Sequence, residues 1–226
     1  MPASVAGVTI RGVLFDFSGT LFRLEFTDPG LPHDDESVRV QRIMLSMTAA
    51  IGPREPLPIH DHPDWARRDL DPDIHRRVYT EAFRQAGITE ALVEPAYRRV
   101  LDPVSWTSYP DTEAALRRLH DADVPVAVVS NIAWDIRPIF DQAGITDLVT
   151  EFTLSYVEGS MKPDEKLFRV ACDRLGVEPA DALMIGDSVA ADGGAATLGC
   201  AVEIVPPIPT GERPDALLSA LAKHGL

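Results

Sequence analysis

Four short segments of the chain carry polar residues of the types that bind phosphate groups and divalent cations. Asp16 directly follows the apolar run GVLF, and Ser130 ends the apolar run VPVAVVS. Lys162 stands before a proline, while Asp187 follows the apolar run ALMIG and precedes Asp192 by five residues. Two acids so close together suit a hard cation with oxygen ligands, and a hydroxyl with neighbouring backbone N–H groups suits phosphate oxygens. The four segments therefore predict a site for an anion and a metal ion.

Each segment also has a purely structural explanation. An aspartate at a strand end, such as Asp16, is as typical of a turn or a helix cap as of a catalytic residue. Ser130 alone is more typical of a helix N-cap than of a phosphate-binding residue. Lys162 is one of three lysines in the chain and on its own fits a surface position. Capping would account for Asp187, but it leaves Asp192 without a role. The chemical interpretation thus depends on the four segments occurring together.

The segments lie in a pattern of alternating strands and helices. Apolar runs predict strands at residues 12–17, 124–130, 149–155, 182–186 and 200–205, and helical spacing predicts helices at 111–122 and 164–176. Strands that alternate with helices form a parallel sheet covered on both faces, and ligands bind beyond the carboxyl ends of its strands. We therefore expect an α/β fold with the site at that edge.

The stretch from residue 23 to 107 has a different character. Its apolar residues recur at helical spacing in SVRVQRIMLSMTAAIG, DIHRRVYTEAFRQAG and EALVEPAYRRVL, whereas PREPLPIHDHPDW, residues 53–65, reads as a loop. We expect residues 1–22 and 108–226 to form the α/β core and residues 23–107 to form an inserted helical domain.

In this order and at these strand ends, the four segments resemble the motifs of the haloacid dehalogenase superfamily. The family's pattern is an Asp nucleophile, a Ser or Thr, a Lys and an acidic pair, here Asp16, Ser130, Lys162, and Asp187 with Asp192. The resemblance implies a Rossmann-like, doubly wound parallel sheet with a helical cap between the first two motifs, the C1 subgroup. Only about thirty residues separate the second motif from the third, too few for a cap at that place.

The resemblance also implies a mechanism and a cofactor. Asp16 would attack phosphorus and form an aspartyl-phosphate that water then cleaves. Mg²⁺ would be held by Asp16, the backbone carbonyl of Ser18 and Asp187, with Asp192 behind them. We therefore expect a magnesium-dependent hydrolase whose site lies in the cleft between core and cap.

Other residues are expected to contact the substrate. Lys162 and the Ser130 hydroxyl would stabilise charge on the transferring group, and Asn131 and Ser18 would bind its oxygens. Arg23, just after the first motif, would meet an anion of the substrate, although a structural ion pair explains it equally well.

The sequence departs from the family's pattern at Ser18. Phosphatases of this family carry a second aspartate there, which protonates the leaving group and later activates water. A serine hydroxyl cannot do this near neutral pH, so turnover should be slow unless another group substitutes. His60 and His62, on either side of Asp61, are candidates for that substitute, but such a run in a proline-rich loop is more typical of a solvated turn.

Three functions follow from these features. The favoured one is a slow phosphatase acting on a small phosphorylated metabolite with a good leaving group, such as an acyl or aryl phosphate. The alternatives are a 2-haloacid-dehalogenase-type hydrolase and a catalytically weak binding or regulatory protein. A phosphonatase would need a cap lysine, and the three lysines, Lys162, Lys166 and Lys223, all lie outside the cap.

Composition limits the partners. The 226 residues include 35 acidic and 21 basic ones, for a formal charge of −14, which argues against nucleic acid but allows a small anionic substrate in a pocket. Cys172 and Cys200 lie in apolar contexts and are expected to be reduced thiols rather than a disulfide. The start of the chain has no pattern of a secretion signal, and no apolar run is long enough to cross a membrane. We expect a cytoplasmic protein, and the sequence does not indicate protein partners.

Overall fold

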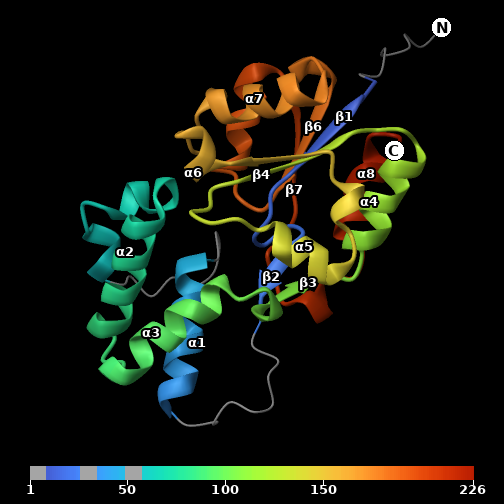
Figure 1. Ribbon diagram of the computed structural model, residues 1–226. Coiled ribbons are helices and arrows are strands. Elements are labelled where there is room, and N and C mark those ends of the chain that lie inside the picture. Colours follow the sequence, from blue (N-terminus) through green and yellow to red (C-terminus); the bar gives the residue numbers. More distant parts are fainter. Residues whose placement is uncertain (1–8, 26–34, 49–57) are drawn as a thin grey trace, which may run out of the picture.

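A computed structural model describes residues 9–25, 35–48 and 58–226 (Figure 1). Five parallel strands form the main sheet in the order β5-β4-β1-β6-β7, and a separate sheet pairs β2 with β3 in antiparallel fashion. The strands are β1 (Gly12–Phe15), β2 (Phe22–Leu24), β3 (Trp106–Ser108), β4 (Val126–Ser130), β5 (Glu151–Leu154), β6 (Ala182–Gly186) and β7 (Ala201–Ile204). The α-helices are α1 (Asp35–Thr48), α2 (Pro72–Gln85), α3 (Glu90–Leu101), α4 (Thr112–Asp121), α5 (Arg137–Ala143), α6 (Ser155–Glu158), α7 (Glu165–Leu175) and α8 (Ala216–Lys223).

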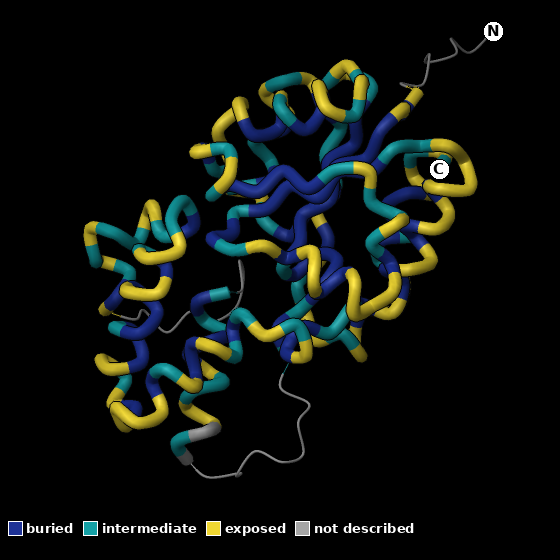
Figure 2. The backbone as a smooth tube through the Cα atoms, viewed as in Figure 1, coloured by how far each residue is buried: buried dark blue, intermediate teal, exposed yellow. Residues whose placement is uncertain are grey.

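Helices cover both faces of the main sheet, as the apolar strands predict. In β1, Val13 faces an apolar cluster that contains Leu116 of α4 and Leu221 of α8. Leu14 points the other way, into a cluster with Phe168 of α7. Strands β1, β4 and β6 are dark blue in Figure 2 because both of their faces are buried, and this explains their nearly unbroken apolar runs. The predicted doubly wound, Rossmann-like α/β fold is confirmed.

The strand order reverses at β1. The chain passes from β1 outward to β4 and β5, and then returns to β6 and β7 on the other side of β1. The loops that follow β1, β4 and β6 therefore diverge and leave a crevice beyond the carboxyl ends of these strands. The first, second and fourth segments lie in or just before these loops.

A mainly helical segment between β2 and β3 contains α1, α2 and α3; we call its described residues, 35–48 and 58–101, the helical insertion (Figure 1). The division into core and cap stays a prediction, and its boundaries lie close to these two strands. The loop expected at residues 53–65 is partly wrong. Pro58–Asp61 form a 3₁₀-helix, and a second one, Trp65–Leu70, begins at the end of this stretch. Residues 53–57 lie outside the described residues.

Helix ends agree with the sequence, with one exception. The Asp164 side chain caps the start of α7, and Gly176 ends it in the left-handed conformation. Asp111 precedes α4 but makes no capping hydrogen bond there. Its Oδ2 instead accepts hydrogen bonds from the backbone N–H groups of Leu217 and Leu218, so it anchors the start of α8. The two cysteines are free and buried, as expected.

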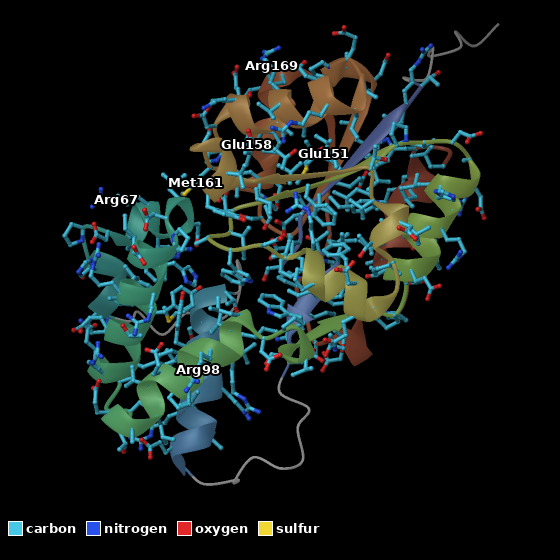
Figure 3. All side chains as sticks on the ribbon, viewed as in Figure 1. Arg67, Arg98, Glu151, Glu158, Met161 and Arg169 are labelled. Carbon is cyan, nitrogen blue, oxygen red and sulfur yellow. The ribbon has the colours of Figure 1, made fainter. Side chains whose placement is uncertain are left out.

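The helical insertion contacts the main sheet beside the carboxyl end of β4. The Ser155 hydroxyl donates to the Asp69 carbonyl over 2.6 Å and accepts from the Ile132 N–H over 2.9 Å. The His75 and Trp134 rings lie 5.0 Å apart between the same two parts. Figure 3 shows Met161, the residue before Lys162, on the side of the core that faces the helical insertion. The insertion is thereby fixed next to the second and third segments.

Candidate active site

The structure brings the four segments together at the carboxyl ends of β1, β4 and β6. Asp16 follows β1, Ser130 is the last residue of β4, and Asp187 follows β6. Lys162 reaches the same place from the loop between α6 and α7. These side chains and that of Asp192 are almost completely buried, so their charges must be balanced locally.

Lys162 supplies most of that balance. Its Nζ donates to Asp16 Oδ1 over 2.5 Å and to Asp192 Oδ1 over 2.6 Å. Burial alone would lower the pKa of Lys162, but the two carboxylates outweigh it and raise that pKa above its usual value. Lys162 is therefore a fixed cation between the nucleophile candidate and the fourth segment.

The second oxygen of each acid has a distinct environment. Asp192 Oδ2 accepts from the Ser188 N–H over 2.8 Å, so both of its oxygens have partners. Asp16 Oδ2 accepts from the Thr20 hydroxyl over 3.2 Å. Asp187 Oδ2 is buried and makes no hydrogen bond within the described part of the chain. A buried carboxylate oxygen without a hydrogen-bond donor is suited to bind a cation.

The turn after Asp16 lies directly against Asp187. Gly19 has a φ of +87°, and a Cβ at this position would lie 2.4 Å from Asp187 Oδ2. A side chain larger than hydrogen cannot be placed there without moving one of the two loops. Gly19 therefore allows the Asp16 and Asp187 loops to approach each other closely.

The three acids form a group that fits a metal ion. Asp16, Asp187 and Asp192 each offer a carboxylate oxygen within 4.8 Å of the others. Burial raises the pKa of Asp16 to about 6, although Lys162 opposes the shift, and burial with repulsion from Asp16 raises the pKa of Asp187 to about 8. These raised pKa values mean that the carboxyl groups resist losing their protons. A bound hard cation, which prefers oxygen ligands, would favour their charged form. The donor set suits Mg²⁺.

Ser18 and Arg23 lie at the side of this group. The Ser18 hydroxyl donates to the carbonyl of Thr48, the last residue of α1, over 3.3 Å. Arg23 forms the ion pair that was the alternative to substrate binding, with Glu25 Oε1 at 2.8 Å. A small cavity beside the site is lined by Ser18, Gly19, Arg23, Leu24, Leu45, Thr48 and Pro207. Arg23 thus lines a cavity, but its charge is already paired.

The geometry agrees with membership of a known family. A model described as haloacid dehalogenase-like hydrolase matches residues 10–198, a range that contains all four segments. The chain belongs to the haloacid dehalogenase-like hydrolase family. The resemblance seen in the sequence is thereby confirmed.

Relatives of this chain include enzymes with different reactions. It is 32% identical over 117 residues to a phosphoserine phosphatase of Thermus thermophilus, covering 51% of this chain and 47% of the relative. It is 32% identical over 143 residues to (S)-2-haloacid dehalogenase 4A of Burkholderia cepacia, covering 62% of this chain and 58% of the relative. The chain thus spans about half the length of the curated relatives it matches.

A solved structure has the same fold as this chain. The crystal structure of a predicted phosphoglycolate phosphatase from Haemophilus somnus superposes with a TM-score of 0.60 at 21% identity, over 95% of this chain and 97% of that one. At that identity the likeness concerns the fold alone. Within the described residues, no helix combines the length and the apolar character that crossing a membrane requires.

The side chain of Asn131 contacts the backbone of Lys162, which the sequence did not predict. Its side-chain amide donates to the Lys162 carbonyl over 3.0 Å and accepts from the Lys162 N–H over 2.7 Å. Asn131 therefore fixes the backbone that carries the lysine, and a role in binding substrate is left to its own backbone N–H. The shared site expected from the sequence places Asn131 and Lys162 close together. The sequence did not indicate that the Asn131 amide would pair with both the N–H and the carbonyl of Lys162.

His62 has a local partner, and His60 lies against a neighbouring ring. His62 Nδ1 accepts from the Asp64 N–H over 3.1 Å, and the His60 ring lies 4.6 Å from the Trp65 ring. These contacts give both rings a local structural role, but the two side chains are half-buried in and beside a 3₁₀-helix rather than in a solvated turn. Thr20, by contrast, contacts the nucleophile candidate and was not recognised from the sequence, although it is four residues from Asp16 in the same turn.

The pKa of Asp187 predicts how the stability of the metal-free hydrolase changes with pH. In the unfolded chain this carboxyl loses its proton near pH 3.8, whereas in the fold it keeps the proton to about pH 8. Between these values the folded state binds more protons, so the stabilisation is complete below the lower pKa and is lost as the pH rises through the higher one. In EDTA, the Tm should fall from pH 5 to pH 9.

The variant Asp187→Asn should flatten this dependence, because an amide does not titrate. At the upper end of the pH range it should melt on the order of 5 °C above the unchanged protein. Asp173→Asn, at an exposed position on α7, is the control and should follow the unchanged protein. Equal slopes for Asp187→Asn and the unchanged protein, measured by circular dichroism, would show that Asp187 is not protonated in the fold.

Proposed function

We propose that this hydrolase is a Mg²⁺-dependent phosphatase that forms an aspartyl-phosphate on Asp16. The observation that carries the proposal is the arrangement of Asp16, held by Lys162, next to Asp187 Oδ2, a buried oxygen with no donor among the described residues. This arrangement supports a carboxylate nucleophile beside a cation site.

The reaction would proceed in two steps. A carboxylate oxygen of Asp16 forms a bond to phosphorus as the bond to the leaving group breaks, and water later cleaves the aspartyl-phosphate. Asp16, Asp187 and the Ser18 carbonyl would hold Mg²⁺, with Asp192 behind them; bound Mg²⁺ supplies positive charge that offsets the repulsion between carboxylate and phosphate. Lys162 holds Asp16 in position, and the Ser130 hydroxyl donates to a phosphate oxygen.

The environment of Ser18 supports a substrate with a good leaving group. Ser18 provides no acid, and the cavity beside it is lined among the described residues by apolar groups, two hydroxyl-bearing residues and the paired Arg23. Among the described lining residues there is no carboxylic acid or imidazole, so none of them can protonate the leaving group, which favours a group that departs without a proton. Acyl and aryl phosphates meet this requirement, whereas simple alkyl phosphates would turn over slowly.

The helical insertion would act as the cap that closes over the substrate. The Ser155 contact with Asp69 and the Ser18 contact with Thr48 support this role, because both join the insertion to loops of the site. Closure of such a lid excludes water and strengthens the electrostatic contacts inside. The cytoplasmic location and the absence of nucleic-acid binding stay predictions.

A haloacid-dehalogenase-type reaction is the second candidate, and a specific observation favours it. A matched relative is named (S)-2-haloacid dehalogenase 4A, and attack on carbon would need no acid at Ser18. The acid at Asp187, with its unpartnered oxygen, favours the metal-dependent reaction instead. A catalytically weak regulatory protein remains the third candidate and would form no aspartyl-phosphate.

The experiment that tests the proposal is a screen of phosphorylated and halogenated small molecules with and without Mg²⁺. We expect phosphate release from acyl and aryl phosphates that requires Mg²⁺ and stops on addition of EDTA. Halide release without added metal would select the dehalogenase reaction. No product from either class, together with no labelled Asp16 after incubation with acetyl phosphate, would select the regulatory protein.

Ser18→Asp should raise phosphatase turnover, because it restores an acid beside the leaving group. General acid–base assistance is worth about 10²–10⁴-fold, so a gain in kcat of at least about tenfold is expected, and the gain should be larger for alkyl than for aryl phosphates. Ser18→Asn is the matched control, since it has nearly the same shape and cannot transfer a proton. Equal kcat values for the two variants would mean that the missing acid does not limit the rate.

A further inference from the structure

A buried arginine from the C-terminal part of the chain forms hydrogen bonds to the turn that follows Asp16. Arg213, on the loop before α8, is only 2% exposed. Its Nη1 donates to the Gly19 carbonyl over 2.8 Å, and its Nη2 donates to the Thr20 carbonyl. The guanidinium fork therefore spans two successive carbonyls of one turn.

The surroundings of Arg213 leave this contact as its main purpose. Its hydrogen-bond acceptors are backbone carbonyls, with Pro206 as the third at 3.3 Å, and its guanidinium carbon lies 3.1 Å from the centre of the Tyr109 ring. The Nε atom is buried and has no hydrogen-bond partner within the described residues. Burying a guanidinium in this way is costly, so a merely structural filler would be apolar.

The gripped turn carries groups that the proposed reaction uses. The Thr20 hydroxyl donates to Asp16 Oδ2, and the peptide before Gly19 contains the Ser18 carbonyl proposed as a metal ligand. Gly19 also packs against Asp187, and a Cβ at Gly19 would lie 3.1 Å from the Pro207 side chain. The loop that carries Pro207 and Arg213 thus lies directly against the turn.

We propose that Arg213 is a positioning residue of the active site. By holding the Gly19 and Thr20 carbonyls, it sets the turn so that the Ser18 carbonyl and Asp16 face Asp187 before metal or substrate binds. This inference rests on the proposed function only where it concerns the metal; the grip on the turn can be measured without it. Side chains that orient metal ligands from behind typically change metal affinity 10–100-fold when they are replaced.

The test compares Arg213→Met, Arg213→Lys and a matched control, Leu217→Ala. Met fills a similar space without donors, and Lys restores a single charged donor. Leu217 is buried on α8 in the same C-terminal region, so its truncation loosens that region without removing a contact to the turn. The first readout is amide hydrogen exchange of the peptide covering residues 17–22 in metal-free protein, compared at equal global stability.

In this readout, the N–H groups of Leu21 and Phe22, both bonded to the Phe17 carbonyl over 3.0 Å, should exchange at least about tenfold faster in Arg213→Met than in Leu217→Ala. The second readout is the Mg²⁺ concentration at the midpoint of the Mg²⁺-dependent rise in Tm. That midpoint should increase about 10–100-fold in Arg213→Met and recover in part in Arg213→Lys.

The outcomes separate the two proposals. Unchanged exchange in the turn of Arg213→Met would overturn the positioning role, and so would an unchanged Mg²⁺ midpoint with the turn loosened, because the grip would then not reach the metal ligands. A loosened turn in a protein whose unchanged form does not respond to Mg²⁺ would keep the grip and overturn the metal-dependent function.

Discussion

Replacing Asp16 by asparagine is expected to lower kcat by at least about 10⁴-fold, because the amide cannot form the bond to phosphorus. The fold should survive, since asparagine has the same shape and its oxygen can still accept from Lys162 Nζ. The loss should appear in single-turnover experiments as well, because the step that fails is chemical.

The measurement is steady-state phosphate release together with acid quenching and mass spectrometry of the peptide that contains position 16. The unchanged enzyme should accumulate a phosphorylated peptide, and the variant should not. Asp111→Asn is a suitable control, because this buried aspartate anchors α8 and lies outside the group of acids. A variant at position 16 with turnover within tenfold of normal would place the nucleophile elsewhere.

Lys162→Met is expected to damage both activity and stability. It removes the cation that holds Asp16 and Asp192, so kcat should fall by about 10²–10³-fold. Removing one partner of a buried ion pair also costs about 3–5 kcal/mol, since uncompensated carboxylates remain buried. Part of this stability should return as the pH falls below the raised pKa of Asp16, because this carboxylate then binds a proton and loses its charge.

Urea unfolding at several pH values and kcat at saturating substrate check these expectations. Lys166→Met is the matched control, because Lys166 is exposed on α7 and its ammonium group donates to the backbone carbonyl of Glu158 rather than to a carboxylate of the site. It should behave as the unchanged protein does. A Lys162→Met protein of normal stability would mean that the ion pairs form only weakly in solution.

The central strands of the main sheet could be predicted because they are buried on both faces. Val126–Ser130 and Ala182–Gly186 contain few polar residues, so their positions follow from composition alone. The strands Phe22–Leu24 and Trp106–Ser108 could not be predicted in this way. Each has three residues, and their pairing joins parts of the chain that are far apart in sequence.

The residues of the site also differ in how far the sequence could predict them. Asp16 and Asp187 follow apolar strands, so their shared edge could be deduced from chain order and sheet topology. The Asn131 contact with Lys162, the Ser18 contact with Thr48 and the Arg213 contact with Gly19 depend on tertiary packing, for which no local pattern exists. The sequence therefore indicated the candidate reacting groups but not the contacts that hold them in place.

The two hydrogen bonds that tie the helical insertion to the strand-end loops differ in strength. The Ser155 bond to Asp69 is short and buried, whereas the Ser18 bond to Thr48 is long and only partly buried. If the insertion moved away from the core, the weaker Ser18 bond would break first. The insertion would then rotate about the stronger Ser155 bond. Loss of the Ser18 hydroxyl should therefore loosen the insertion less than loss of the Ser155 hydroxyl.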